Sequence, residues 1–162
     1  MAKAAADPAR LEAALRADTS GLIRAVLVSH VDTATSIRND IPAIRAAMDA
    51  AGHPALLAAD CIASLGCDPF EMDASGVDVM IAASQKGLMV PPGLGFVWLS
   101  DKALAACAGS DLRTPYWDWT AREGELHYQK YAGTPPEHLL FGLRQALDML
   151  FAEGLGNVFR RH

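Results

Sequence analysis

The stretch ALLAADCIASLGCDPFEMDASGVDVMIAASQK, residues 55–86, decides the fold. It contains two short apolar runs, 55–59 and 77–82, and each run ends in polar residues. The first run ends at Asp60, and the second leads into Ser84, Gln85 and Lys86. Runs of this length bounded by turn residues are typical of buried strands.

Two further runs extend the pattern outward from this stretch. The β-branched run 23–28 predicts a strand covered on both faces, and 94–99 predicts a fourth strand. The link 83–93 carries two prolines and two glycines and is too short for a helical crossover, so we expect the fourth strand to be antiparallel to its neighbour.

Helical patterns alternate with these strands. Asp7 with Pro8 and Asp40 with Pro42 predict two helix starts, while Thr134 to Glu137 (TPPE) fits a capping box before a longer helix that ends at Gly154. Residues 110–133 are predicted to be a long irregular excursion. The alternation predicts an α/β fold with a mostly parallel sheet.

The composition and net charge of the chain limit the kinds of molecule that it is expected to bind. The chain has 162 residues, about one domain, with 51% hydrophobic residues and a net charge of −5. This charge argues against nucleic acid or an anionic membrane as the main partner. Three cysteines in no zinc-like spacing favour a reducing, cytoplasmic location, and we expect no metal site.

Asp60 and Lys86 are the strongest candidates for chemistry. The carboxyl ends of parallel strands meet at one edge of a sheet, where ligands bind, so both side chains should project toward that edge. A lysine there could form a Schiff base with a carbonyl cofactor, and an aspartate beside it could keep a pyridinium nitrogen protonated. The alternative is a loop-capping aspartate and an exposed lysine.

Two other groups of residues have a structural alternative. His30 to Thr35 (HVDTAT) follows the first strand and could hydrogen-bond a ligand, but turn and capping roles are the favoured explanation from the residues alone. Thr134 is expected to cap a helix, and a helix N-terminus is also a phosphate site. The aromatic residues of 116–131 indicate packing or an interface more often than a substrate wall.

Five segments of the chain have a familiar order and spacing, namely HVDTATSIRNDI, AGHPALLAADCIASLG, MDASGVDVMIAASQKGLMVPPGLGFVWLSDKAL, YAGTPPEHLLFGLRQALDMLFAEGL and NVFRRH. Together they resemble the class V aminotransferases, which depend on pyridoxal 5′-phosphate (PLP), and in particular the alanine–glyoxylate and serine–glyoxylate branch. The resemblance runs from about Asp7 to His162. The 26-residue separation of Asp60 and Lys86 also matches the family's spacing.

The resemblance implies a role for each matching residue. Lys86 matches the catalytic lysine that holds PLP as a Schiff base, and Asp60 matches the aspartate paired with the pyridine nitrogen. Thr33 matches a hydroxyl residue beside the ring, and Gln85 matches a contact to the cofactor phosphate. Two residues match positions that reach the phosphate in the neighbouring subunit, namely Tyr131 and Thr134. Shared sites of this kind imply a homodimer.

The resemblance also implies the fold and what the chain lacks. The fold is expected to be part of the large domain of a fold-type I PLP-dependent transferase, a three-layer αβα structure. Family members are more than twice as long, so 1–162 matches an incomplete PLP-binding large domain. It lacks the N-terminal phosphate loop and stacking aromatic, and the C-terminal domain with the arginine that binds the substrate carboxylate. Ser36 stands where the family usually has glycine, which costs about 1 kcal/mol if φ is positive there.

The implied reaction moves an amino group from serine or alanine to glyoxylate or a similar 2-oxo acid. Since substrate-positioning elements are missing, the chain alone is expected to be weakly active or inactive. A truncated PLP-binding or dimerisation remnant without catalysis remains an alternative. Another class V chemistry, lyase or desulfurase, is less favoured because those relatives typically have histidine where this chain has Gln85.

Overall fold

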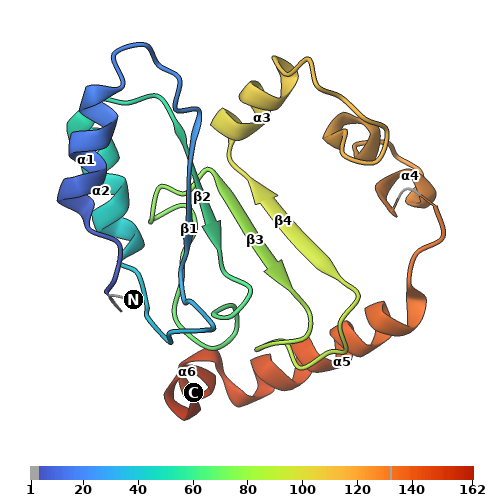
Figure 1. Ribbon diagram of the computed structural model, residues 1–162. Coiled ribbons are helices and arrows are strands. Elements are labelled where there is room, and N and C mark those ends of the chain that lie inside the picture. Colours follow the sequence, from blue (N-terminus) through green and yellow to red (C-terminus); the bar gives the residue numbers. More distant parts are fainter. Residues whose placement is uncertain (1–3, 132) are drawn as a thin grey trace.

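The computed structural model describes residues 4–131 and 133–162. A four-stranded sheet forms its centre, with strand order β1-β2-β3-β4 (Figure 1). The strands are β1 (Ala25–Ser29), β2 (Leu56–Asp60), β3 (Val79–Ala83) and β4 (Gly95–Leu99). The first three run parallel and β4 is antiparallel to β3, as the short link between them predicted. The expected α/β fold with a mostly parallel sheet is confirmed.

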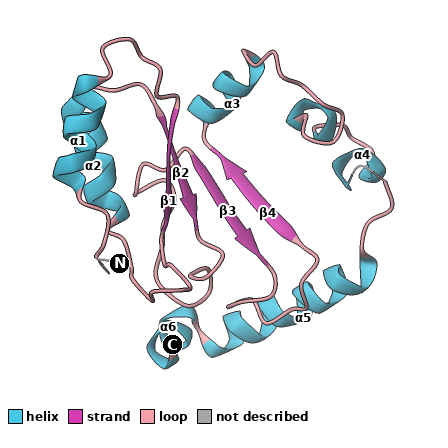
Figure 2. Cartoon of the chain, viewed as in Figure 1, coloured by secondary structure: helices cyan, strands magenta, loops and turns pink. Residues whose placement is uncertain are grey.

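Two helices, α1 (Pro8–Ala17) and α2 (Ile41–Ala51), pack against one face of this sheet (Figure 2). Both begin as predicted. The Asp7 carboxylate accepts hydrogen bonds from the amides of residues 9 and 10, and Asp40 accepts one from the amide of residue 43. At the end of α2, Gly52 adopts φ 63°, the left-handed conformation that closes a helix without steric cost to glycine.

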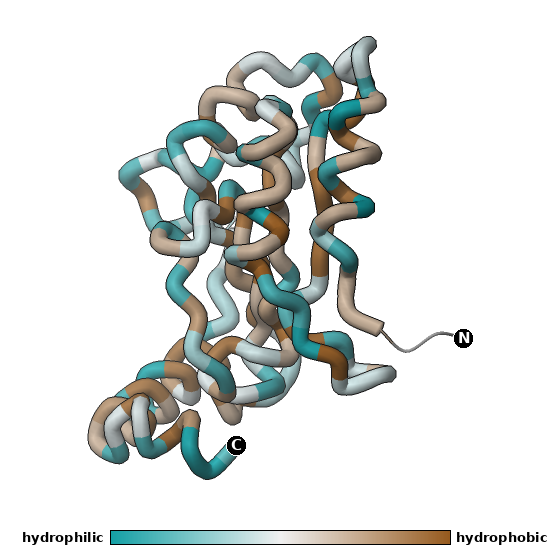
Figure 3. The backbone as a smooth tube through the Cα atoms, turned by 90° about the vertical axis from the view of Figure 1, so that its left-hand side faces the viewer, coloured by the Kyte–Doolittle hydropathy of each residue, from teal (hydrophilic) through white to brown (hydrophobic). Residues whose placement is uncertain are grey.

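The main core lies between these helices and the sheet. Figure 3 shows helices banded by hydrophobic and hydrophilic residues, the pattern of an element with one buried face. The buried core side chains are Leu15, Ile41, Ile44, Met48, Ala55, Leu57, Ala59, Cys61, Val77 and Met80.

The opposite face of the sheet is exposed, which corrects one expectation. Leu27, on β1, is 80% exposed, so this strand is not covered on both faces. Ile81 of β3 and Val97 of β4 share that face by register and are also exposed. An apolar run shows that a strand can be buried, but the segments that cover it determine whether it is.

The C-terminal third contains more helix than the sequence predicted. The structure adds α3 (Asp101–Ala108), a 3-10 turn η1 (Trp119–Arg122) and a short α4 (His127–Tyr131) before α5 (Glu137–Glu153) and α6 (Leu155–Arg161). Within the described residues, no helix combines the length and apolarity needed to cross a bilayer.

The predicted capping box at Thr134 is wrong. Helix α5 begins at Glu137 with Pro136 at the cap position and no side-chain hydrogen bond there, and Thr134 is exposed. The reason is steric. Pro135 precedes another proline, which disfavours the helical conformation at Pro135, so the helix starts later.

Helices α5 and α6 form a second, smaller core beneath the carboxyl ends of the strands (Figure 1). Leu150 of α5 and Val158 of α6 bury Leu88, which lies two residues after Lys86. Leu65 and Phe96 pack at its edge. This core anchors the loop that carries the candidate lysine.

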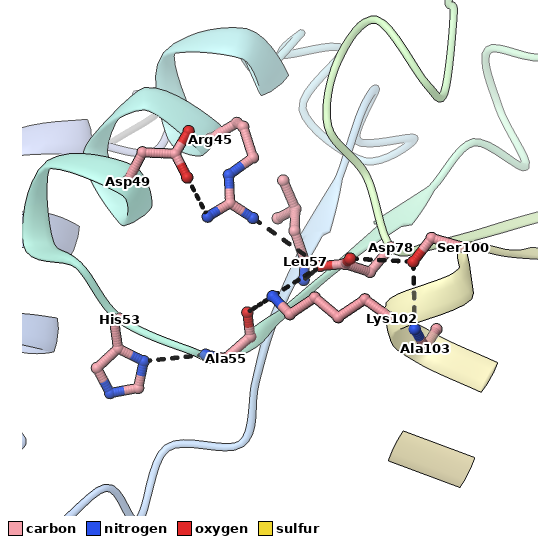
Figure 4. Close-up of polar contacts among 9 residues, drawn as sticks. All are labelled: Arg45, Asp49, His53, Ala55, Leu57, Asp78, Ser100, Lys102 and Ala103. Carbon is pink, nitrogen blue, oxygen red and sulfur yellow. Dashed lines mark hydrogen bonds and ion pairs between the residues drawn. The ribbon is translucent and has the colours of Figure 1, made fainter. Parts of the chain in front are cut away.

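A buried carboxylate, Asp78, joins the strands at the opposite end of the sheet (Figure 4). Its Oδ2 atom accepts a hydrogen bond from the amide of Leu57 at 2.9 Å, and its Oδ1 atom accepts one from the Ser100 hydroxyl at 3.0 Å. The cations of Lys102 and Arg45 lie 3.4 and 3.9 Å from Oδ2. One side chain therefore connects β2, the start of β3 and the N-terminus of α3.

Candidate active site

Asp60 is the last residue of β2 and lies at the carboxyl-end edge of the sheet, as predicted. In register it stands between Ser29 of β1 and Ile81 of β3. Its Oδ1 atom accepts a hydrogen bond from the amide of Ile62 at 2.8 Å, and the side chain is only partly buried. The carboxylate is therefore held by the turn that follows it and can still reach a ligand.

Asp60 also lies at the end of an apolar hollow on the exposed sheet face. The hollow is lined by Leu27, Val28, Ser29, Ala58, Ala59, Asp60, Val79 and Ile81. Its walls are mainly aliphatic, and the carboxylate provides a negative charge at the carboxyl end. This combination suits a flat heterocycle with a protonated ring nitrogen.

Gln85 and Lys86 lie in the loop after β3, and both side chains are exposed. Ser84, which is fully buried, closes this loop. Its amide donates to the carbonyl of Leu94 at 3.1 Å, and its hydroxyl donates to the carbonyl of Pro91 at 2.8 Å. Sequence reasoning did not assign a role to this serine, because its partners follow seven and ten residues later.

Two glycines bring the loops after β2 and β3 into close contact. A Cβ on Gly87 would lie 2.3 Å from the carbonyl oxygen of Leu65 and 2.7 Å from the sulfur of Cys67. A Cβ on Gly66 would lie 3.2 Å from the Gly87 carbonyl. The loop of Lys86 therefore packs backbone to backbone on the turn that follows Asp60.

His30 is buried, which rules out the direct ligand contact considered for it in this conformation. It is 5% exposed, and its Nδ1 atom lies 2.9 Å from the hydroxyl oxygen of Ser64. Its Nε2 atom lies 3.5 Å from Asp68, which in turn pairs with Arg38 at 3.1 Å. This network was not predicted, because 34 residues separate the histidine and the serine.

The pKa of His30 is lowered from its ordinary value of 6.5, chiefly because burial disfavours the charged ring. The neighbouring Asp68 raises the pKa and Arg38 lowers it, and both effects are smaller. The folded chain therefore prefers the neutral ring. Since the Nε2 atom faces a carboxylate, the Nε2–H tautomer allows Nδ1 to accept the Ser64 hydroxyl proton.

The free energy of unfolding is expected to fall as the pH drops through 6.5, because the unfolded chain binds a proton at His30 before the folded chain does. The loss should level off below the folded-state pKa. Denaturant titrations of the chain and of His30→Gln across this range measure it. A pH dependence that is identical in both proteins would contradict the assignment to His30.

Thr33 lies in the exposed turn after β1, also at the carboxyl-end edge. The carboxylate of Asp32 organises this turn by accepting hydrogen bonds from the amide and the hydroxyl of Thr35, both at 2.7 Å. The turn role weighed for this segment is therefore confirmed for Asp32. Ser36, two residues before the strand-like bridge at Arg38, has φ 57°.

Ser36→Gly is expected to raise the free energy of unfolding by about 0.5 kcal/mol. Relief of the left-handed strain exceeds the entropy that glycine adds to the unfolded chain. Urea denaturation of the variant measures the gain. Ser110→Gly is the matched control, because Ser110 is not among the positive-φ residues and should lose stability. An equal loss of stability in Ser36→Gly and Ser110→Gly would contradict the backbone strain at Ser36.

Tyr131 and Thr134 lie apart from the other candidates. Helix α4, which ends at Tyr131, lies beyond β4, on the far side of the sheet from β1 (Figure 1). Both side chains are exposed, while Ala132 between them lies outside the described residues. The structure therefore groups Thr33, Asp60, Gln85 and Lys86 in the loops at one edge, and it places Tyr131 and Thr134 on a separate segment, at the end of α4 and between α4 and α5.

His53 and Cys61, two residues of types that can bind metals, have other surroundings. His53 contacts Asp18 at 3.3 Å, and burial raises the pKa of the Cys61 thiol to about 11. Across 4–131 and 133–162, no group of three histidine, cysteine or acidic side chains lies close enough to hold a metal ion.

A comparison with known protein families identifies the family of the chain that carries these residues. The profile of the family described as Aminotransferase class-V matches residues 2–162. The chain belongs to the class-V aminotransferase family. A serine–glyoxylate aminotransferase of Methylorubrum extorquens is 48% identical over 97% of this chain and 40% of its own length. An L-aspartate–glyoxylate aminotransferase of Paracoccus denitrificans is 44% identical over 94% of this chain and 39% of its own.

Solved structures agree with this class-V assignment. The alanine–glyoxylate aminotransferase of Nostoc sp. superposes with a TM-score of 0.84 at 27% identity, over 99% of this chain and 42% of that protein. A pyridoxamine–pyruvate aminotransferase of Mesorhizobium loti gives 0.80 at 28% identity, with coverage of 98% and 40%. The fold is that of the fold-type I PLP enzymes, and the family's cofactor is PLP. The chain spans about two fifths of the length of these relatives.

The residues of this class-V chain fit that cofactor. A carboxylate and an exposed amine stand at the carboxyl ends of two adjacent parallel strands, and an apolar hollow leads to the carboxylate. Asp60 would hold the ring nitrogen, Lys86 the aldehyde carbon and Gln85 the phosphate, with Thr33 beside the ring.

Proposed function

We propose that the chain is the central part of the large domain of an aminotransferase that moves an amino group from serine or alanine to glyoxylate or a similar 2-oxo acid. The observation that carries this proposal is the placement of Asp60 and Lys86 at the ends of β2 and β3, with their loops in contact through Gly66 and Gly87. The relatives named for serine, aspartate and alanine as donors all share glyoxylate as the acceptor, which supports that half of the proposal.

In this proposal PLP supplies an aldehyde and an electron-withdrawing ring that spreads the electron pair left when the Cα–H bond breaks. Lys86 Nζ would hold the aldehyde carbon in the resting site. With a donor amino acid bound, the free Lys86 amine would act as the base that takes the proton from Cα of the donor and as the acid that gives it back. The Asp60 carboxylate accepts a hydrogen bond from the ring nitrogen and keeps that nitrogen protonated. Serine and glyoxylate would yield hydroxypyruvate and glycine.

The proposal includes a homodimer in which Tyr131 and Thr134 approach the phosphate in the second copy's site. Both are exposed, and Tyr131 ends α4, which lies beyond β4 (Figure 1). The same C-terminal third exposes large apolar side chains at Tyr116, Trp117, Tyr128, Phe141 and Phe151. Exposed aromatic residues at this density are typical of an interface.

A cytoplasmic location stays a prediction from the composition.

Borohydride trapping tests the site. The chain is incubated with PLP and reduced, and its peptides are mapped by mass spectrometry. Selective modification of Lys86 is expected, with loss of modification in Asp60→Ala and retention in Lys102→Ala. Modification spread evenly over Lys86, Lys102 and Lys130, or none at all, would overturn the proposal that this chain holds the cofactor.

A single-turnover assay then tests the reaction. The PLP-loaded chain is mixed with serine or alanine, and the loss of the bound aldehyde absorbance is followed. Slow conversion by either donor, restored by glyoxylate with release of glycine, supports amino transfer. Release of pyruvate together with ammonia from serine, without recovery on adding glyoxylate, would instead identify a lyase, and release of sulfide when cysteine replaces the donor would identify a desulfurase.

A further inference from the structure

We propose that His30 and Ser64 are positioning residues that fix the turn after β2 and thereby aim the Asp60 carboxylate. The proposal rests on the proposed function, since Asp60 is there the partner of the cofactor ring. It adds a role for two buried side chains that do not reach the ligand. Ser64 is 1% exposed, so its hydroxyl serves only the interior of the protein.

The turn is the direct support of the carboxylate. The Ile62 amide donates to Asp60 Oδ1 at 2.8 Å, so the orientation of that peptide sets the orientation of the carboxylate. Within the turn, the amides of Ser64 and Leu65 donate to the carbonyl of Cys61 at 3.1 and 2.9 Å. These bonds shape the turn, and the Cys61 amide ties its first residue to β3 by donating to the carbonyl of Ile81 at 2.8 Å.

His30 attaches the turn on its other side, to β1, at two points. Its main-chain amide donates to the carbonyl of Asp60 at 2.8 Å, which continues the pairing of β1 with β2. Its ring nitrogen Nδ1 meets the Ser64 hydroxyl at 2.9 Å, four residues further along the turn. The two contacts bracket Asp60 and Ile62, so the turn cannot rotate without breaking one of them.

The ring itself is held in place from two other sides. Phe70 packs on it with ring centroids 4.9 Å apart, and Asp68 lies 3.5 Å from Nε2. Asp68 is kept near the ring by the guanidinium of Arg38 at 3.1 Å. A buried ring with both nitrogens occupied has one orientation, and a fixed support of this kind is what a precisely placed site requires.

His53 offers a matched control within the same chain. It is a partly buried histidine whose Nε2 atom faces Asp18 at 3.3 Å and whose Nδ1 atom accepts from the amide of Ala55 at 3.2 Å. It precedes β2, whereas His30 follows β1, so the two rings serve opposite ends of the sheet. His53→Gln therefore removes a similar histidine–aspartate pair without touching the turn after Asp60.

The first test needs no cofactor. Hydrogen exchange at the Ile62 amide, measured by NMR in the chain alone, reports its bond to Asp60. We expect exchange to quicken about tenfold in His30→Gln, in Ser64→Ala and in Asp60→Ala, and to be unchanged in His53→Gln. Equal exchange in His30→Gln and the parent chain, or equal acceleration in His53→Gln, would overturn the proposal.

The second test uses PLP as the probe. The dissociation constant is expected to rise about tenfold in His30→Gln and in Ser64→Ala, the factor that corresponds to one buried hydrogen bond. The double variant should be no worse than either single one, and His53→Gln should lower only the melting temperature. Additive losses in the double variant would contradict a shared role.

The two tests separate failure of the inference from failure of the proposed function. Absence of PLP trapping at Lys86 in the parent chain, together with the expected exchange pattern at Ile62, would reject the cofactor site and keep the support of Asp60. Normal trapping with unchanged affinity in both variants would keep the cofactor site and reject the positioning role.

Discussion

Asp78→Ala is expected to lower the free energy of unfolding by about 3 kcal/mol. The substitution leaves the buried amide of Leu57 without its acceptor and the half-buried Lys102 without its counter-charge, while Arg45 loses Asp78 but keeps its closer partner Asp49 at 2.6 Å. The value lies at the lower end of the range for broken buried ion pairs, because Lys102 is 45% exposed and solvent screens it. Urea denaturation monitored by circular dichroism measures the loss.

Two further variants serve as controls for Asp78→Ala. Asp78→Asn keeps an acceptor for Leu57 but removes the charge, so its loss should be about half as large. Asp73→Ala removes an exposed carboxylate from a nearby turn and should change stability by less than about 0.5 kcal/mol. A loss in Asp78→Ala no greater than that in Asp73→Ala would show that the buried carboxylate does not connect the strands.

Gly87→Ala is expected to cost about 2 kcal/mol of stability and to abolish selective PLP trapping at Lys86. The new methyl group would lie 2.3 Å from the carbonyl oxygen of Leu65, which is backbone and cannot move without shifting the turn. The loop must therefore separate from the turn, and the neighbouring lysine moves with it. Denaturant titration and borohydride trapping measure the two effects.

Gly95→Ala is the control for Gly87→Ala. A Cβ at Gly95 would meet nothing within 4 Å, and this residue has no positive φ, so the variant should be close to neutral in both measurements. Normal trapping at Lys86 in a stable Gly87→Ala protein would refute the close contact of the two loops.

The sequence predicted those elements whose signals are local. The caps at Asp7 and Asp40 start α1 and α2 where expected, because each carboxylate bonds amides two or three residues away. The four apolar runs gave strands displaced by at most two residues. The position of Asp60 and Lys86 at the carboxyl-end edge followed from strand ends and topology, since parallel strands bring their carboxyl ends to one edge, whereas their roles came from the family resemblance.

Other features depend on contacts that the local sequence does not encode. The His30–Ser64 bond spans 34 residues, and the exposure of Leu27 depends on what covers the sheet. Helix α3 was not predicted, although Ser100 caps it, because its eight residues show little amphipathic pattern. Thr134 failed as a cap because the double proline outweighed a favourable capping sequence.

The hydrogen bonds of Ser84 limit how the sequence of the loop after β3 can vary. The Ser84 amide donates to the carbonyl of Leu94 and its hydroxyl donates to the carbonyl of Pro91, so the two ends of the loop that carries Lys86 are held together. Exchanges at an exposed position of the loop such as Met89 would then alter what surrounds the lysine without disturbing the pairing of β3 with β4. Gly87 and Leu88 are fixed by their contacts with the turn after Asp60 and with α5 and α6, so variation of this loop is confined to its solvent-facing side.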